Sequence, residues 1–237
     1  MSKSMIYDGR DFADLLHIEA VRRPIAGDRS ADAADWHGRG GRLKSVSTDA
    51  KRIEVDVRAF SHERGRAAQG RELEAIRREL GALLVRDEPR ELVLPDAPDL
   101  YDFAVLDGST GLERVSCSSK ATLTFLCPEA ASYGVAETVE MPDGGTAHCL
   151  VAGSTWTAPV VMVQASAPFS VTFDGVPFQV LGTPAGYCGV DAVKHEVTCA
   201  GASVRYDITS DFPVWEPGRH TISCELPFTA RWRPRWL

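Results

Sequence analysis

The sequence predicts a mainly β protein, in which a first domain of β-sheet with one helix precedes an antiparallel β-sandwich. Two observations lead to this fold class. Apolar and polar residues alternate at strand spacing along much of the chain, and one long segment has the apolar spacing of an amphipathic helix. A length of 237 residues is enough for two domains with separate cores. We expect domains at 1–135 and 136–226, followed by a C-terminal strand at 227–237.

The first domain is expected to contain half-buried strands and a single helix. Residues 52–60 alternate without a break, with Ile53, Val55 and Val57 on one face, which is typical of an antiparallel strand. Residues 71–85 carry leucines at helical spacing, and the polar, proline-containing run after them ends the helix. Further strands are expected at 91–94, 100–106, 112–117 and 120–127.

The second domain is expected to be built from short strands alone. Residues 133–145 are polar and rich in turn residues, which indicates a domain boundary. Residues 169–180 form the clearest hairpin, because Asp174 and Gly175 suit the positive φ values of a type I′ turn. The regular spacing of the strands favours a β-sandwich. The other expected strands are 146–152, 158–165, 187–192, 195–199, 203–208 and 219–226.

The C-terminal residues have an unusual pattern of aromatic and basic side chains. At strand spacing, one face carries Phe228, Ala230, Trp232, Pro234 and Trp236, and the other carries Thr229, Arg231, Arg233 and Arg235. Because proline cannot donate a ladder hydrogen bond, we expect an edge strand or a bulge. The arginine face is either solvated or an interface with acidic groups. The candidate interface residues are Arg231, Trp232, Arg233, Arg235 and Trp236.

Composition limits the classes of partner. The 33 acidic and 26 basic residues give a net charge of −7, which argues against binding to nucleic acid or to anionic lipid. No apolar run approaches the ~20 residues of a membrane-spanning helix, so no membrane partner is expected. The first residues lack the apolar segment of a secretory signal. We therefore expect synthesis and assembly in a cytoplasm.

The cysteines and histidines do not indicate a metal site or a cofactor. The six cysteines contain no CxxC pair, and the six histidines are not at ligand spacing beside them. Free, mostly buried thiols are expected in a reducing compartment. Cys188 and Cys199 are placed to face each other across a hairpin, which leaves a disulfide between them as an alternative.

No catalytic residues are assigned from the sequence. The usual motifs for nucleophilic, metal-dependent and nucleotide-dependent catalysis are absent. Asp96, Asp99 and Asp102 are interpreted as a polar loop leading into a strand instead of a carboxylate pair for glycoside hydrolysis. We therefore expect a protein that acts by binding and is not an enzyme.

Three aromatic residues of the second domain have two interpretations. Trp156, Tyr187 and Trp215 are candidates for a platform on which a sugar ring stacks. The alternative is packing in the core or at an interface, which is the commoner use of tryptophan.

Several segments together resemble the distal tail protein (Dit) family, also called phage tail component, of long-tailed siphophages. The N-terminal segment 5–24 resembles the opening of that family, and residues 35–46 resemble its glycine-rich loop before a long alternating strand. PheLeuCysProGluAlaAlaSerTyrGly at 125–134 is similar to the signature closing its first domain, although Pro128 comes early. SerAspPheProValTrpGluProGly, from Ser210, is similar to its Phe-Pro segment, with Trp215 at the usual leucine position.

This resemblance implies a structural component of the virion. It implies a first domain that closes into a homo-hexameric ring, a galectin-like sandwich as the second domain, and a place at the tail tip. The ring would be an adaptor joining the tail tube protein to a tail-fibre, tail-associated lysin or receptor-binding hub. The basic-aromatic end resembles the family's terminal strand and is expected to return to the first domain. Two alternatives are a carbohydrate-binding module that attaches the virion to host cell-wall polymer and, less favoured, a wall hydrolase.

Overall fold

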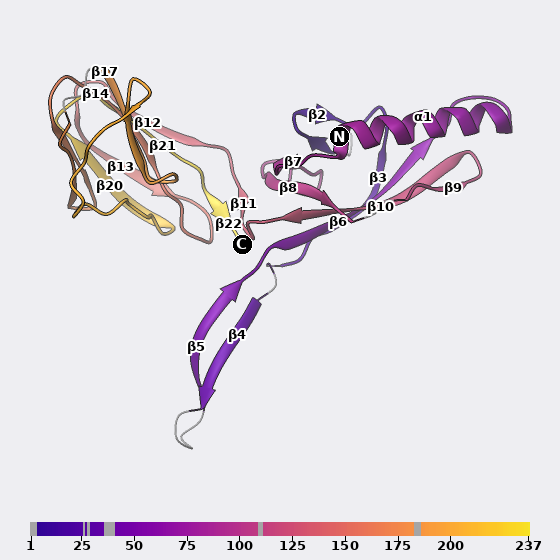
Figure 1. Ribbon diagram of the computed structural model, residues 1–237, viewed down its shortest axis with the longest axis horizontal. Coiled ribbons are helices and arrows are strands. Elements are labelled where there is room, and N and C mark those ends of the chain that lie inside the picture. The colour runs from indigo at the N-terminus through magenta and orange to yellow at the C-terminus, as the bar shows by residue number, and fades with distance from the viewer. Residues whose placement is uncertain (1–3, 26, 28, 36–40, 109–110, 183–185) are drawn as a thin grey trace. The chain divides into compact units, whose positions relative to one another are not determined.

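The computed structural model describes residues 4–25, 27, 29–35, 41–108, 111–182 and 186–237. The chain divides into two compact units, Met1–Ser132 with Leu237, and Tyr133–Trp236 (Figure 1). Each unit is built mainly from antiparallel strands, which confirms the predicted fold class. Of the segment 35–46 that carried part of the family resemblance, residues 36–40 lie outside the described residues.

The first unit contains an eight-stranded sheet in the order β2-β1-β7-β8-β10-β6-β3, with β9 paired to β10. Its longest ladder joins β6 to β10, with Lys51 opposite Cys127 and Phe60 opposite Ser118. A separate ladder joins β4 to β5. The strands of this unit are β1 (Ile6–Tyr7), β2 (Arg10–Asp11), β3 (His17–Arg22), β4 (Arg29–Asp35), β5 (Gly41–Thr48), β6 (Lys51–Phe60), β7 (Arg90–Val93), β8 (Asp102–Asp107), β9 (Glu113–Val115) and β10 (Ser118–Cys127).

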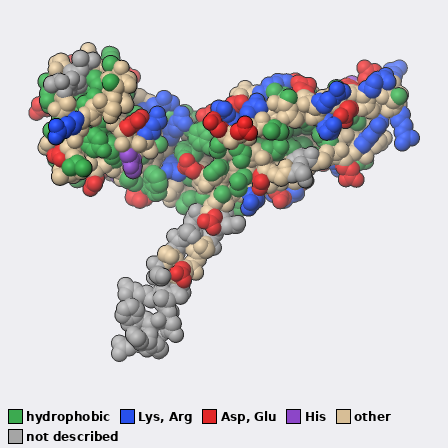
Figure 2. Space-filling view, in the orientation of Figure 1, with side chains coloured by type: hydrophobic (Ala, Val, Ile, Leu, Met, Phe, Trp, Pro, Cys, Tyr) green, Lys and Arg blue, Asp and Glu red, His purple; other side chains and the backbone are tan. Residues whose placement is uncertain are grey.

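Helix α1 (Arg66–Leu84) packs its apolar stripe on the core of this unit. Leu73, Leu80 and Leu84 are buried with the inward residues of β6, as the sequence pattern predicts. The helix begins five residues before the predicted start. Residues 66–70 carry no large apolar side chain, so the leucine pattern did not include them. Charged side chains of both signs cover its outer face (Figure 2).

A cluster of charged side chains is buried in the first unit around Asp102. The Lys51 ammonium lies 2.6 Å from the Asp102 carboxylate and donates to Ser132 Oγ at 2.8 Å, and Ser132 donates to Asp102 at 2.7 Å. Arg23 donates to the other oxygen of Asp102 and to Asp96. The expected loop leads into a strand, β8, whose first residue is Asp102, but the complete burial of Asp102 was not expected. The cations and the hydroxyl compensate the desolvation of the carboxylate.

The second unit is a sandwich of two antiparallel sheets. One sheet has the order β12-β21-β14-β17-β18-β19 and the other β13-β20-β15-β16, with apolar side chains of both between them. This confirms the predicted sandwich. A short ladder joins β11 (Ser132–Tyr133) to β22 (Arg235–Trp236). The sandwich strands are β12 (Glu137–Met141), β13 (Gly145–Val151), β14 (Val160–Ala165), β15 (Phe169–Phe173), β16 (Val176–Val180), β17 (Gly186–Asp191), β18 (Glu196–Cys199), β19 (Ala202–Ser203), β20 (Gly218–Cys224) and β21 (Phe228–Trp232).

Two features of the second unit differ from the sequence expectations. Residues 137–141, interpreted as part of a polar boundary, form β12 and pair with β21. The expected edge position of the C-terminal strand is wrong, because β21 lies between β12 and β14. Residues 228–232 include no proline, so both of their ladders can form, and the pairing stops before Pro234. Both ladders of β21 lie within the second unit.

The predicted hairpin turn is confirmed. Asp174 and Gly175 connect β15 to β16 with φ values of 49° and 86°, as a type I′ turn requires. Burial tends to raise the pKa of Asp174, but hydrogen bonds from His220 and Thr221 lower it below its ordinary value. The carboxylate therefore ties the turn to the neighbouring strand β20.

Candidate interface around the C-terminal strands

Strand β21 presents its two faces as the alternation predicts. Phe228, Ala230 and Trp232 are buried in the core of the sandwich, and Arg231 points outward. Trp232 is only 5% exposed and meets the Trp215 ring edge-to-face at 5.6 Å. Among the candidate interface residues, Trp232 therefore belongs to the core and has no surface available for a partner.

Arg231 lies on the outer surface of the six-stranded sheet. Its neighbours in register are Thr138 on β12 and Val160 on β14, and neither is charged. It has no ion-pair partner within the described part of the chain, and it is exposed. A guanidinium in this position can meet a carboxylate of another molecule without losing an internal ion pair.

Residues 233–236, which we call the C-terminal clasp, follow β21 and hold a neighbouring loop. The carbonyl of Arg235 accepts a hydrogen bond from the backbone N–H of Ser154 at 2.9 Å. The carbonyl of Arg233 accepts one from the Thr157 hydroxyl at 2.7 Å. The clasp therefore fixes residues 153–157 to the end of the sandwich.

The clasp also holds the first residues of the second unit. The backbone N–H of Gly134 donates to the carbonyl of Pro234 at 2.9 Å, and the Trp236 ring lies so close that a Cβ on Gly134 would approach it to 2.5 Å. The Arg235 guanidinium lies 4.5 Å from the Trp156 ring centroid and 5.1 Å from that of Tyr133. The cation–π contacts of Arg235 and the close approach of Trp236 to Gly134 place both side chains in intramolecular packing.

Replacing Gly153 with Ala is expected to open the clasp. Gly153 has a φ of 118°, and a Cβ there would lie 2.3 Å from the carbonyl oxygen of Arg235. We expect a loss of more than about 1 kcal/mol and faster hydrogen exchange at 153–157 and in the clasp. Gly175→Ala is the matched control, because Gly175 also has a positive φ but has open space around it. Equal effects of the two changes would contradict the close approach at Gly153.

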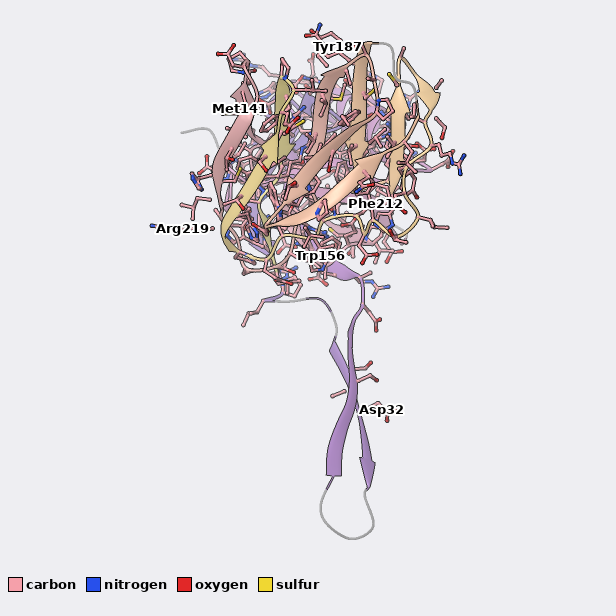
Figure 3. All side chains as sticks on the ribbon, turned by 90° about the vertical axis from the view of Figure 1, so that its left-hand side faces the viewer. Asp32, Met141, Trp156, Tyr187, Phe212 and Arg219 are labelled. Atoms are coloured by element: carbon pink, nitrogen blue, oxygen red, sulfur yellow. The ribbon has the colours of Figure 1, made fainter. Side chains whose placement is uncertain are left out.

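The three sugar-stacking candidates do not form one platform. Trp215 is 1% exposed, so its ring cannot meet a ligand. Trp156 is 45% exposed, but the Arg235 guanidinium lies over its ring. Tyr187 is exposed, and it lies at the opposite end of the sandwich from Trp156 (Figure 3).

The cysteines are free thiols, and five of the six are buried. Cys188 and Cys199 are partners in register on β17 and β18, as the hairpin interpretation predicts, without a disulfide between them. Burial raises the pKa of the Cys188 thiol to about 12, with a further contribution from Cys199. Within the described residues there is no group of three or more His, Cys, Asp or Glu side chains arranged to hold a metal ion. No helix in the described ranges is long and apolar enough to span a membrane.

The two units, in this order along the chain, define the fold of a phage distal tail protein. The chain is similar to the distal tail protein of Bacillus phage SPP1, with 27% identity over 150 residues, which is 60% of this chain and 55% of that protein. The crystal structure of SPP1 Dit, described as a paradigm of the hub adsorption apparatus in phages infecting Gram-positive bacteria, matches with a TM-score of 0.81. That match has 20% identity and covers 99% of both chains.

Structures of the phage P2 baseplate in its activated conformation also match. The form with Ca gives a TM-score of 0.57 at 9% identity over 98% of this chain and 97% of that chain. The form with Sr gives 0.54 at 10% identity over 97% of each. No protein-family model matches the sequence. The similarity to SPP1 Dit confirms the resemblance to distal tail proteins.

Proposed function

We propose that this chain is a structural component of a phage tail tip. In this proposal it forms a homo-hexameric ring that joins the tail tube protein to a tail-fibre, tail-associated lysin or receptor-binding hub. The observation that carries the proposal is the match to SPP1 Dit along the whole of both chains. The sequence alignment covers 55% of the SPP1 protein, so partners and assembly are inferences for this chain. The place of action is the virion, after assembly in the host cytoplasm, and the role is binding instead of catalysis.

Ring formation is the direct test of this function. The purified full-length protein, imaged by negative-stain electron microscopy over a range of concentrations, is expected to give rings with a central channel. Mass photometry of the same samples is expected to show a species of six copies. A strict monomer at every concentration would contradict the adaptor function.

Arg231 is the strongest remaining candidate for a contact between copies, because its charge is exposed and is not used within the described residues. We expect Arg231→Ser to raise the concentration at which rings form about fivefold, corresponding to an ion pair worth about 1 kcal/mol. The effect should diminish at high salt, and the thermal stability of the subunit should be unchanged. Arg219→Ser, at an exposed arginine on β20, is the control. Identical assembly of both variants and the parent would exclude Arg231 from the interface.

The other arginines of the C-terminal segment are less suitable for this test. The Arg235 guanidinium lies over the Trp156 ring, and the Arg233 side chain is partly buried within the clasp. Changing either residue perturbs the clasp as well as any interface, so a loss of assembly would have two explanations.

A further inference from the structure

The two sheets of the sandwich end in four edge strands, and these edges are protected to different degrees. Edge strands usually avoid pairing with other chains because they are short, charged, interrupted by proline or covered. Strand β19 has two residues, β12 carries Glu137 and Glu140, and β16 contains Pro177. The backbone N–H of Asp207 donates to the carbonyl of Gln179 at 2.9 Å, so β16 is covered as well.

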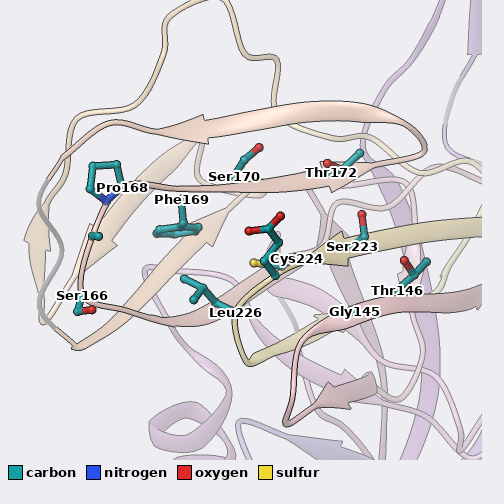
Figure 4. A pocket seen from close by; sticks show the side chains of 12 residues that line it. Gly145, Thr146, Ser166, Pro168, Phe169, Ser170, Thr172, Ser223, Cys224 and Leu226 are labelled. Carbon is teal, nitrogen blue, oxygen red and sulfur yellow. The ribbon is translucent and has the colours of Figure 1, made fainter.

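Strand β13 has none of these protective features. It contains seven residues, Gly145–Val151, without Lys, Arg, Asp, Glu or Pro, and its ladder with β20 has no register shift. On its other side it makes no backbone hydrogen bond to any residue that the structure describes. Figure 4 shows the start of this strand, where Thr146 lies beside Ser223 on β20. The backbone of β13 is therefore available to one further strand.

Three residues of β13 direct their backbone N–H and C=O groups to this free edge. The backbone N–H of Asp174 donates to the carbonyl of Thr221 at 2.9 Å, so the backbone of Thr221 faces β15. Because antiparallel strands alternate, His220 faces β13, where its partner is Cys149. The residues of β13 that face away from β20 are then Thr146, His148 and Leu150. They offer the row of donors and acceptors that an added strand requires.

Apolar side chains at this edge are incompletely covered. Leu150 is 65% exposed on the outer face of the sheet. On the inner side, Val139 and Met141 of β12 are only partly buried, whereas Val161, an inward residue of the interior strand β14, is fully buried. Met141 reaches β13, because a Cβ on Gly145 would lie 3.4 Å from its Cε. An added strand with apolar residues at alternate positions would cover this surface.

The charge around the edge is negative, and it defines the partner. Gly144, in the turn before β13, packs so closely on the backbone of Glu225 that a Cβ would lie 2.5 Å from its carbonyl oxygen. The carboxylates near the edge that have no ion-pair partner in the described part of the chain are Glu137, Glu140, Asp143 and Glu225. Neither β12 nor β13 contains Lys or Arg. A second copy of this edge would bring the same carboxylates, whereas a strand with Lys or Arg is complementary.

We propose that β13 is the docking site for an extended, basic segment of another protein, which adds to the four-stranded sheet as a fifth strand. The backbone of that segment pairs with Thr146, His148 and Leu150, its apolar side chains cover Met141, and its Lys or Arg side chains meet the carboxylates. This docking is independent of ring assembly, because all of these residues belong to the second unit of one copy.

The test uses a synthetic peptide, acetyl-Lys-Thr-Val-Thr-Val-Thr-Val-Thr-Lys-amide, added at millimolar concentration to the full-length protein. Hydrogen exchange is measured residue by residue. The peptide is expected to slow exchange at least tenfold at the outward amides of Thr146, His148 and Leu150, and to leave Ala147 and Cys149, which pair with β20, unchanged. The matched control peptide has Glu in place of both Lys residues and should bind more weakly. No slowing by the Lys peptide, or equal slowing by both peptides, would overturn the proposal.

Two variants assign the bound peptide to β13. His148→Pro removes an outward N–H without breaking the ladder to β20, and it is expected to weaken peptide binding at least tenfold, equivalent to about 1.4 kcal/mol. Leu150→Lys places a charge on the edge, as protected edge strands do, and should also weaken binding of the Lys peptide. Tyr187→Ala changes an exposed residue of the other sheet and should bind as the parent does. Full binding by both β13 variants would refute the assignment.

Protein concentration distinguishes a partner protein from a second copy. Without peptide, exchange at the three outward amides is expected to be independent of protein concentration. Slower exchange at these amides as the protein is concentrated would identify a second copy at β13 and overturn the choice of a basic partner.

Discussion

Replacing Asp102 with Asn is expected to lower the free energy of unfolding of the first unit by about 3–5 kcal/mol. The change removes the carboxylate that compensates the Lys51 ammonium, and Lys51 is only 4% exposed. A buried ammonium without a carboxylate partner destabilises the folded state, because its desolvation is no longer compensated. Chemical denaturation, together with hydrogen exchange in β6 and β8, measures the effect.

The matched control is Asp107→Asn in the same strand. Asp107 pairs with Arg52 at 3.1 Å, but both side chains are well exposed, so a change below about 1 kcal/mol is expected. Replacing both buried partners, as Lys51→Met with Asp102→Leu, is expected to cost less than Asp102→Asn alone, since no buried charge is stranded. A loss for Asp102→Asn as small as that of the control would show that the cluster is hydrated.

Replacing Trp232 with Ala is expected to destabilise the second unit by about 3–5 kcal/mol. The ring is 5% exposed, packs on Trp215, and fills the core between the two sheets. The expected observation is a lower melting temperature at every protein concentration, with accelerated hydrogen exchange in β14 and β21. Alanine leaves a cavity that the surrounding strands cannot close.

The neighbouring position separates core packing from assembly. Arg231→Ala changes the next residue of the same strand but removes an exposed side chain, so its subunit stability should match that of the parent. A Trp232→Ala variant with parental stability and impaired assembly would return Trp232 to the interface and contradict its place in the core.

The sequence predicted the elements that depend on residues close to one another in the chain. The alternation of residues 52–60 identifies β6 and its buried face, and the Asp174-Gly175 pair identifies a turn whose φ values agree. The leucine stripe identifies α1, although not its first turn. In each case the burial or backbone geometry depends on residues within a few positions of one another.

The features that sequence reasoning missed depend on distant partners. Asp102 has the composition of a surface loop around it, and its burial is stabilised by Arg23, 79 positions away, and by Lys51. Trp215 is a different case, because core packing was one of its two interpretations, and contacts with β15 and β21 do bury it. No pattern in the sequence near Asp102 indicates its burial, because both cations that pair with it are distant in the chain.

The internal position of β21 constrains how the second unit is made. Its partners β12 and β14 precede it in the chain. Glu137 and Trp232, which pair with each other, lie near opposite ends of the sequence of the second unit. During translation the six-stranded sheet therefore stays divided, with the pairing edges of β12 and β14 uncovered, until residues 228–232 leave the ribosome. Ribosomes that stall before Phe228 should hold a nascent chain whose first unit resists protease and whose second unit does not.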